Sequence, residues 1–233
     1  ELVKMGFNRV SIGVQDFDPN VQKAINRIQS KEQVENVIQS ARDNQVDSIS
    51  IDIIYGLPKQ SQESFSRTLD EVIRILPDRI ALYNYAHMPQ RIAAQRLIHS
   101  SDIPSTEEKL AIFTDSIRRL TEAGYIYIGM DHFALPTDSL AIALENGGLQ
   151  RNFQGYSTHA ECDVIGVGVS AISRINDGYS QNVTEVSKYK DLVEKGVLPI
   201  KKGVNLTPDD RIRADLIQQI MCDGMVSYSD FGA

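Results

Sequence analysis

Apolar and polar positions follow two different periods along the first half of the chain. Four short runs rich in valine, isoleucine and tyrosine predict β-strands, at residues 9–15, 48–55, 79–85 and 125–130. Between these runs, apolar residues recur every three or four positions, which predicts amphipathic helices. Strongly apolar strands that alternate with helices are typical of a parallel sheet covered by helices, so we expect an α/β fold.

This alternation leaves two architectures open, an open doubly wound sheet and part of a β/α barrel. Both architectures bind ligands at the C-terminal ends of their strands. A site at this edge would bring together amide, phenol, carboxylate and imidazole groups. The residues that supply them are Gln15, Tyr83, Asn84, Tyr85, Asp131 and His132.

The second half of the chain, after about residue 136, has a weaker pattern. Thr207-Pro208 predicts the start of another helix, and apolar residues follow at helical spacing. We expect residues 1–206 to form one domain and residues 207–233 to begin a second, helical one. Glu1 to Gly6 resemble the last turn of a helix that ends at a C-cap glycine, and no methionine begins the chain. We therefore expect a piece of a larger protein.

Composition narrows the function classes. Lys and Arg total 24 against 31 Asp and Glu, a net charge of −7, whereas nucleic-acid-binding surfaces usually carry a basic excess. No apolar run approaches the roughly 20 residues of a membrane-spanning helix. The two cysteines, Cys162 and Cys222, are too few for a disulfide framework and have no metal-ligand spacing. We expect a cytoplasmic protein without nucleic-acid or membrane partners.

Four side chains are candidates for a functional site, and each could instead have a purely structural role. Asp52 interrupts an apolar strand, so it needs a cation, a ligand hydroxyl or backbone donors, and a buried structural ion pair would also serve. Arg27 could bind an anion or form a surface salt bridge, and Gln15 could contact a ligand or cap a turn. His132 beside Asp131 could be a general base with its orienting carboxylate, or a core histidine with satisfied hydrogen bonds.

Two polar-aromatic motifs indicate a pocket. Residues 129–134 read Gly-Met-Asp-His-Phe-Ala, and residues 151–156 read Arg-Asn-Phe-Gln-Gly-Tyr. Their polar side chains are costly to bury unless each has a partner, so packing alone does not account for two such clusters. The chain has neither a G-x-G-x-x-G phosphate loop nor a G-x-S-x-G nucleophile elbow. The residues by themselves therefore support an α/β ligand-binding domain.

Together with these two motifs, five further stretches resemble one enzyme family. They are Gly13-Val14-Gln15-Asp16-Phe17, Asn26-Arg27, residues 51–60, Asn84-Tyr85-Ala86-His87 and residues 168–173. Over essentially its whole length the chain resembles the oxygen-independent coproporphyrinogen III oxidases (coproporphyrinogen dehydrogenases), radical S-adenosylmethionine (SAM) enzymes of haem biosynthesis. The Met-Asp-His-Phe motif at residues 130–133 and the Asn-Phe-Gln-Gly-Tyr motif at residues 152–156 separate these oxidases from a related haem-chaperone group.

The resemblance implies the second half of a radical SAM partial (β/α)6 barrel, followed by the start of a C-terminal helical domain. It also implies two cofactors, SAM and a [4Fe-4S] cluster whose Cys-x-x-x-Cys-x-x-Cys loop would lie upstream of Glu1. Reductive cleavage of SAM would give a 5′-deoxyadenosyl radical, which would take a β-hydrogen from a propionate of coproporphyrinogen III. Loss of CO2 and one electron, at two propionates, would leave the vinyl groups of protoporphyrinogen IX. The chain alone is expected to be inactive, with an open edge strand where the barrel is incomplete.

The resemblance also implies roles for individual residues. By motif, the SAM contacts fall on Gln15, Arg27, Asp52, Ala86 and Ile172. Asp52 can accept from hydroxyl or ammonium groups, and Arg27 can pair with a carboxylate. On the substrate side are Gln154, which lies in the oxidase-specific motif, and Arg151, an anion partner for the propionates whose alternative is an exposed salt bridge. The resemblance assigns no residue of this chain as a catalytic group or a metal ligand.

Two other functions remain open. One is a haem-chaperone relative that binds haem and SAM without oxidising porphyrinogen. The other is an unrelated α/β hydrolase or aldolase that uses Asp131 and His132. The oxidase interpretation further implies a reductant protein that supplies electrons to the cluster, and we expect the protein to be a monomer.

Overall fold

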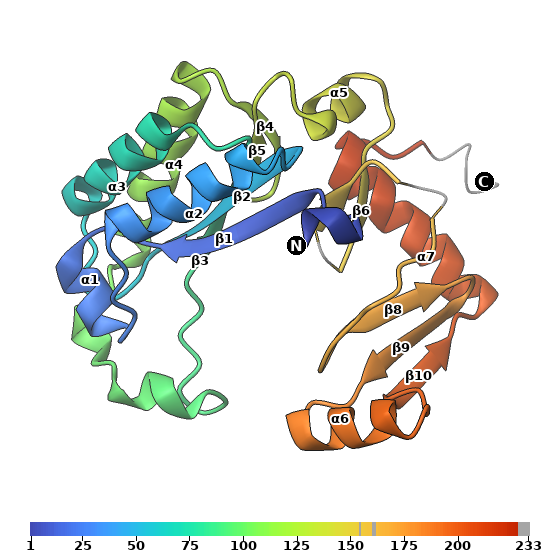
Figure 1. Ribbon diagram of the computed structural model, residues 1–233. Coiled ribbons are helices and arrows are strands. Elements are labelled where there is room, and N and C mark those ends of the chain that lie inside the picture. The colour runs from blue at the N-terminus through green and yellow to red at the C-terminus, as the bar shows by residue number, and fades with distance from the viewer. Residues whose placement is uncertain (154, 160–161, 228–233) are drawn as a thin grey trace. The chain divides into compact units, whose positions relative to one another are not determined.

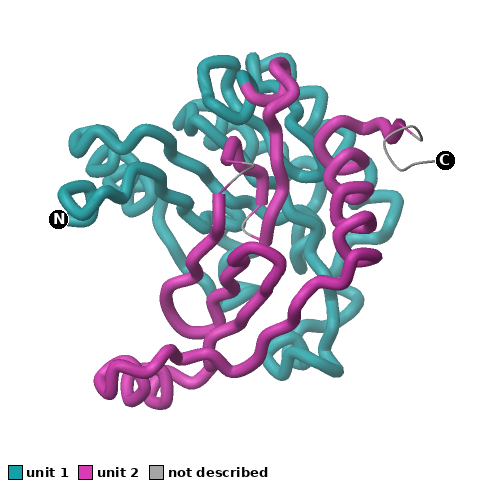
Figure 2. The backbone as a smooth tube through the Cα atoms, turned by 90° about the vertical axis from the view of Figure 1, so that its right-hand side faces the viewer, with its two compact units in different colours: residues 1–142 teal, residues 143–233 magenta. Residues whose placement is uncertain are grey.

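The computed structural model describes residues 1–153, 155–159 and 162–227. Its contacts divide the chain into two compact units, residues 1–142 (unit 1) and residues 143–233 (unit 2), which are coloured separately in Figure 2. The domain boundary expected between residues 206 and 207 falls inside unit 2 and remains a prediction.

Unit 1 contains a five-stranded sheet whose strands alternate with helices (Figure 1), which confirms the predicted α/β class. The strands are β1 (Arg9–Gln15), β2 (Ser48–Tyr55), β3 (Arg79–Asn84), β4 (Ile126–Gly129) and β5 (His132–Ala134). The helices are α1 (Pro19–Ala24), α2 (Lys31–Asp43), α3 (Gln62–Ile75), α4 (Thr106–Glu122) and α5 (Ser139–Glu145), the last of which crosses the unit boundary. Short 3₁₀ turns lie at Val3–Met5, Ala93–Leu97 and Ser100–Asp102.

The sheet is mixed rather than wholly parallel. Its order is β1-β2-β3-β5-β4, in which β1, β2 and β3 are parallel and β5 is antiparallel to both of its neighbours. β4 therefore runs in the same direction as β1, β2 and β3, as the sequence pattern predicts, but β5 lies between β4 and β3. The chain reverses at Gly129 and Met130, whose φ angles are 149° and 49°. The three residues of β5 are too few for hydrophobic periodicity to reveal them as a strand.

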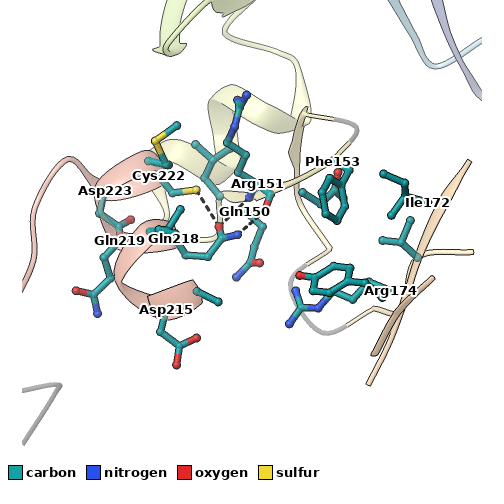
Figure 3. A pocket seen from close by; sticks show the side chains of 18 residues that line it. Gln150, Arg151, Phe153, Ile172, Arg174, Asp215, Gln218, Gln219, Cys222 and Asp223 are labelled. Atoms are coloured by element: carbon teal, nitrogen blue, oxygen red, sulfur yellow. Dashed lines mark hydrogen bonds between the residues drawn. The ribbon is translucent and has the colours of Figure 1, made fainter. Parts of the chain in front are cut away.

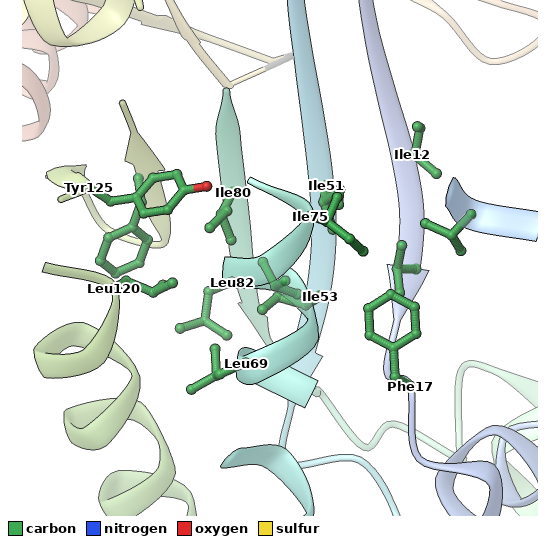
Figure 4. Packing of buried hydrophobic residues seen from close by; sticks show 14 of the residues in the cluster. Ile12, Phe17, Ile51, Ile53, Leu69, Ile75, Ile80, Leu82, Leu120 and Tyr125 are labelled. Atoms are coloured by element: carbon green, nitrogen blue, oxygen red, sulfur yellow. The ribbon is translucent and has the colours of Figure 1, made fainter. Parts of the chain in front are cut away.

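One face of this sheet packs against α2, α3 and α4. Alternate strand residues point to this face and join the apolar residues of the three helices in one buried cluster. Figure 4 shows strand members of the cluster, including Ile12, Ile51, Ile53, Ile80 and Leu82. Burying one such side chain contributes about 1.5–3 kcal/mol, so the cluster fixes the register of the strands. The residues between these positions lie on the opposite face, which we call the polar face.

α2 and α4 each begin at a serine that caps the helix. Ser30 accepts a hydrogen bond from the backbone N–H of Gln33, and Ser105 accepts one from that of Glu108. Each pair completes a capping box because the third residue of the helix bonds back to the cap. In unit 2, Thr207 caps α7 (Pro208–Gln218) in the same way.

Unit 2 is built mainly from short antiparallel strands. A two-stranded sheet pairs β6 (Gln150–Asn152) with β7 (Gly155–Ser157), and a three-stranded sheet has the order β10-β9-β8, with β8 (Ile172–Ile175), β9 (Gly178–Asn182) and β10 (Ile200–Asn205). α6 (Val186–Glu194) connects β9 to β10, and α7 continues into a π-helical turn, Gln219–Asp223. Within the described ranges of both units, no helix has the length and apolar character needed to cross a membrane.

Candidate functional site

The polar face of the unit 1 sheet carries a row of cross-strand neighbours. Gly13 pairs with Asp52, Asp52 with Ala81, and Ala81 with His132. Direct cross-strand neighbours point to the same face of a sheet, and adjacent strands lie about 4.8 Å apart. Asp52 and His132 therefore lie on one face, two strands and about 10 Å apart.

Asp52 and Arg27 come together near Gly13. The Ser11 hydroxyl donates to Asp52 Oδ1 at 2.8 Å, and Arg27 Nη2 donates to the Gly13 carbonyl oxygen at 2.6 Å. A Cβ added to Gly13 would lie 2.8 Å from Gln15 Nε2 and 3.3 Å from Arg27 Nη2, so a larger residue would displace both side chains. Within the described chain, neither Asp52 nor Arg27 forms an ion pair. Among the described residues, Asp52 therefore has no partner for a buried ion pair and Arg27 none for a surface salt bridge.

Gln15 ends β1 in a left-handed conformation, with φ at +70°. Such a conformation costs a residue with a Cβ on the order of 1–2 kcal/mol. The side-chain amide folds back toward Gly13, and its buried Oε1 accepts no hydrogen bond from any described residue. The side chain therefore does not cap a turn, and this alternative is wrong. A buried acceptor without a donor is unfavourable, so Oε1 is suited to accept a donor from a ligand.

The next residue, Asp16, holds the end of β1 in place. It is 0% exposed, and its carboxylate accepts from the Asp18 N–H at 2.6 Å, Thr68 Oγ1 at 2.7 Å and Gln60 Nε2 at 2.5 Å. Burial raises the pKa of Asp16, and these three donors oppose the rise. Because Thr68 belongs to α3 and Gln60 to the loop after β2, the network fixes the turn in which Gln15 lies.

Ala86 lies just past the end of β3 and is exposed. The backbone N–H of Tyr85 donates to the Tyr55 carbonyl oxygen at 2.9 Å, which keeps this segment at the C-terminal edge of the sheet. Gln95 Nε2 donates to the Ala86 carbonyl oxygen at 3.0 Å, and Gln95 Oε1 accepts from the N–H of Met88. Gln95 thus fixes the backbone on both sides of residue 87.

Asp131 and His132 form the hydrogen-bonded pair that the sequence suggests. Asp131 Oδ1 lies 2.6 Å from His132 Nδ1, and the Asp131 carbonyl oxygen accepts from the Leu82 N–H at 2.7 Å. This contact fixes the orientation of the His132 ring relative to the Asp131 carboxyl group. Burial raises the pKa of Tyr55 and of Tyr127, and the negative charge of Asp131 raises both further. The pair thus lies at the turn between β4 and β5, among tyrosines that stay protonated.

Unit 2 contains a cavity of about 860 Å³, shown in Figure 3 and here called the unit-2 cavity. This volume lies in the range of small-molecule sites, about 300–1,000 Å³. Its walls come from the β6–β7 hairpin, from β8 and β9, and from α7 with the π-helical turn. Polar and aromatic side chains line these walls, among them Gln150, Phe153, Arg174, Tyr179 and Gln218.

Arg151 is bound to α7 through its backbone. Gln218 Oε1 accepts from the Arg151 N–H at 3.0 Å, and Gln218 Nε2 donates to the Arg151 carbonyl oxygen. The Arg151 side chain points away from that of Gln150 (Figure 3), and its Cζ lies 4.8 Å from the centre of the Tyr156 ring. Its Nη1 is buried and donates to no described residue. Within the described part of the chain, Arg151 therefore forms no exposed salt bridge.

The predicted SAM contacts fall in both units. Gln15, Arg27 and Asp52 come together on the polar face of unit 1, and Ala86 lies at the same edge of that sheet. Ile172 belongs to unit 2, where it begins β8 and lines the unit-2 cavity. Gln154, predicted on the substrate side, lies outside the described residues.

The side chains that could bind a metal ion are scattered over the described chain. Among residues 1–153, 155–159 and 162–227, no three His, Cys, Asp or Glu side chains are placed to hold a metal ion. Cys162 is exposed, Cys222 is buried, and both are free thiols. The described residues therefore supply no ligand set for an iron–sulfur cluster.

Known proteins match this chain over almost its entire length. Residues 1–72 match the family model of the Radical SAM superfamily. The oxygen-independent coproporphyrinogen III oxidase of Pseudomonas aeruginosa is 52% identical over 229 residues, which are 98% of this chain and 50% of that protein. The protein of the same name from Thermostichus vulcanus is 45% identical over 220 residues, which are 94% of this chain and 68% of that protein. The chain belongs to the oxygen-independent coproporphyrinogen III oxidase family.

A solved structure agrees with this membership. Coproporphyrinogen III oxidase from Escherichia coli, a radical SAM enzyme, superimposes with a TM-score of 0.91 at 47% identity. The match covers 98% of this chain and 53% of that one. The predicted resemblance and the radical SAM fold class are therefore confirmed. The chain spans about half the length of the Pseudomonas and Escherichia members of the family.

The sequence does not predict the role of three residues that position the site, which are Asp16, Gln95 and Gln218. Asp16 lies within one of the family motifs, where a carboxylate beside Gln15 and Phe17 is a usable signal of a buried network. The other two act on backbone groups 9 and 67 residues away in sequence, and backbone partners leave no pattern of residue types.

Proposed function

We propose that the protein containing these 233 residues converts coproporphyrinogen III to protoporphyrinogen IX by oxidative decarboxylation of two propionates to vinyl groups. The observation that carries this proposal is the grouping of Gln15, Arg27 and Asp52 on the polar face of unit 1. All three match positions that contact SAM in the oxidase family. The oxidase names of the similar proteins favour this function over the haem-chaperone alternative.

The residues of the polar face fit SAM. When bound and cleaved by an electron from a [4Fe-4S] cluster, SAM supplies the radical that removes a hydrogen from the propionate. Asp52 has one oxygen engaged by Ser11, and its other oxygen can accept from ribose hydroxyls or from an ammonium group. Arg27 donates to Gly13 through one nitrogen and retains further N–H groups for a carboxylate. Gln15 Oε1 would receive the donor that the described chain does not supply.

On the substrate side, Arg151 and Gln154 are the proposed contacts. The buried Nη1 of Arg151 lacks an acceptor in the described chain, and a propionate carboxylate would provide one. The role of Gln154 rests on its place in the oxidase-specific motif. The reaction needs an electron source for the cluster, so a reductant protein is a proposed partner, and a monomer in the cytoplasm is the proposed state.

The test uses the complete gene product, with its cluster reconstituted in the absence of oxygen. Supplied with coproporphyrinogen III, SAM and a low-potential reductant, it should form vinyl product and 5′-deoxyadenosine together. An intact cluster that yields neither product would refute the oxidase function. Deoxyadenosine without vinyl product would instead indicate a different radical substrate.

Asp52→Asn isolates the contribution of the polar face. The variant keeps the oxygen that accepts from Ser11 but loses the negative charge. We expect about 10- to 100-fold weaker SAM binding, the range for a lost hydrogen bond to a charged group, and a parallel fall in both products. Asp43→Asn, at the exposed end of α2, is the matched control and should bind SAM as the wild type does.

A further inference from the structure

Arg174 carries a charge that no described residue balances. It lies on β8 two residues after Ile172, so the two side chains point to the same side of the strand, and both line the unit-2 cavity (Figure 3). Arg174 is half-buried, and within residues 1–153, 155–159 and 162–227 it forms no ion pair. Arg211 of the same unit contrasts with it, because Arg211 pairs with Asp177 at 3.1 Å on the exposed surface.

The surroundings of Arg174 are aromatic. Tyr179 is its cross-strand partner on β9, and the Tyr179 ring centre lies 6.0 Å from Arg174 Cζ. This distance is at the outer limit of a cation–π contact, so the ring contributes little energy to holding the charge. Phe153 packs its ring edge-on against Tyr179, with the centroids 5.2 Å apart. Apolar rings lower the local dielectric, so a carboxylate would bind Arg174 more strongly here than in water.

The acids that line the cavity do not neutralise Arg174. Asp215 and Asp223 are both lining residues, and neither lies within ion-pair distance of its guanidinium. In Figure 3, Arg174 extends from the β8 side into the cavity, whereas Asp215 lies on the α7 side. A guanidinium presents two parallel N–H groups that match the two oxygens of a carboxylate. Beside the aromatic rings of Phe153 and Tyr179, the cavity thus offers a group that can bind an organic carboxylate.

We propose that Arg174 binds a propionate of the porphyrinogen other than the one that reacts, and thereby sets which propionate is presented to the radical. The inference rests on the proposed function, because it takes its ligand from that reaction. Coproporphyrinogen III has four propionates and only two react, so non-reacting carboxylates must be accommodated at each step. Ile172, a proposed SAM contact, is about 7 Å away along β8, which places Arg174 beside the reacting region.

The test measures binding and product distribution in the complete gene product. Coproporphyrin III, which is fluorescent and keeps the four propionates, is titrated in the absence of SAM and reductant. Arg174→Met should weaken binding about 10- to 100-fold, and Arg174→Lys should weaken it less because the charge is kept. Arg211→Met is the matched control and should bind as the wild type does. The tetramethyl ester of coproporphyrin III should bind wild type and Arg174→Met equally.

Turnover supplies the second measurement. Arg174→Met should release more product with a single vinyl group relative to the divinyl product, while its affinity for SAM stays at the wild-type value. Unchanged coproporphyrin affinity with an unchanged product ratio would overturn the inference. The inference would also be overturned if Arg174→Met lost as much affinity for SAM as for coproporphyrin III, or if its melting temperature fell well below that of the wild type. Arg174 would then have a structural role. Failure of the wild type to form any vinyl product would instead refute the proposed function.

Discussion

Unit 1 and unit 2 differ in the interactions that hold their strands together. In unit 1, β1, β2, β3 and β5 contribute to one apolar layer, and side chains such as Ile51, Ile53 and Ile80 are 0% exposed. In unit 2, all six residues of β10 are exposed. Among the described residues of unit 2, the buried apolar side chains are Leu149, Tyr156, Val183 and Cys222.

Unit 2 relies instead on side chains that bond to the backbone of distant segments. Gln218 pairs with both backbone groups of Arg151, and Asn182 Nδ2 donates to the carbonyl oxygens of Gly166 and Gly168 at 3.2 and 2.9 Å. Apolar burial is non-directional, whereas hydrogen bonds act only over a narrow range of distance and angle. The candidate ligand-facing residues of unit 1 are therefore positioned by a rigid layer, and those of unit 2 by a few individual bonds.

The largest effect expected from this difference is in the core of unit 1. Ile51→Ala should lower the free energy of unfolding by about 2–5 kcal/mol, because the cavity left in the packed layer cannot refill. Urea denaturation would measure the loss, and hydrogen exchange should locate it in β1, β2 and β3 rather than in β8 to β10. Val37→Ala, at a 48% exposed position on α2, is the control and should change stability little. A loss under about 1 kcal/mol, or equally faster exchange in both units, would break the comparison.

A smaller and more local effect is expected in unit 2. Gln218→Ala removes two hydrogen bonds from the Arg151 backbone, which should cost about 1–3 kcal/mol. The Arg151 amide should then exchange faster with solvent, while β1 to β3 keep their protection. Gln181→Ala, which removes a single exposed bond to the Ser170 carbonyl oxygen, is the matched control and should leave the Arg151 amide protected. Unchanged exchange at Arg151 in the Gln218 variant would contradict a role for individual bonds.

The smallest effect expected is a pH dependence from Asp16. Its pKa is raised in the folded protein above its ordinary value of 3.8, so the folded state holds this proton more tightly than the unfolded state. The contribution of Asp16 to stability is therefore fully present below pH 3.8 and declines as the pH rises through the raised pKa. Asp16→Asn cannot titrate and should lack this decline.

Urea titrations at several pH values would show the effect of Asp16 as the stability of wild type minus that of the variant. The difference should fall with rising pH. Thr68→Val removes one donor that lowers the pKa of Asp16, so the decline should extend to higher pH in that variant. A difference that rises with pH would show that the three donors outweigh burial.

The apolar layer of unit 1 explains why the sequence predicts the strands of this unit well. β1 and β2 have the predicted bounds and β3 ends one residue early, because strands buried on one face impose a strong apolar pattern. The ends of these strands locate Gln15 and bring Asp52 onto the polar face, and family motifs single out Arg27. The spacing of residues along the chain does not predict the hydrogen bonds between these residues and their neighbours, which only the structure reveals.

What the sequence does not predict lies where the apolar pattern is short or absent. β5 has three residues, and β6 to β10 expose much of their length, so periodicity cannot separate them from loops. Ile172 is singled out by its family motif alone, and Arg151 by a positive charge that could pair with a propionate. The cavity that both line depends on Gln218, whose partners are backbone groups.

The row Gly13, Asp52, Ala81 and His132 also constrains how the gene can change in length. Successive strand residues point to opposite faces, so one codon inserted or deleted within β1, β2 or β3 would turn every later side chain of that strand over. A change in β2 before Asp52 would move Asp52 into the apolar layer, and an isoleucine would take its place on the polar face. Length variation among descendants of this gene should therefore be confined to segments outside these three strands, which keep their residue count across evolution.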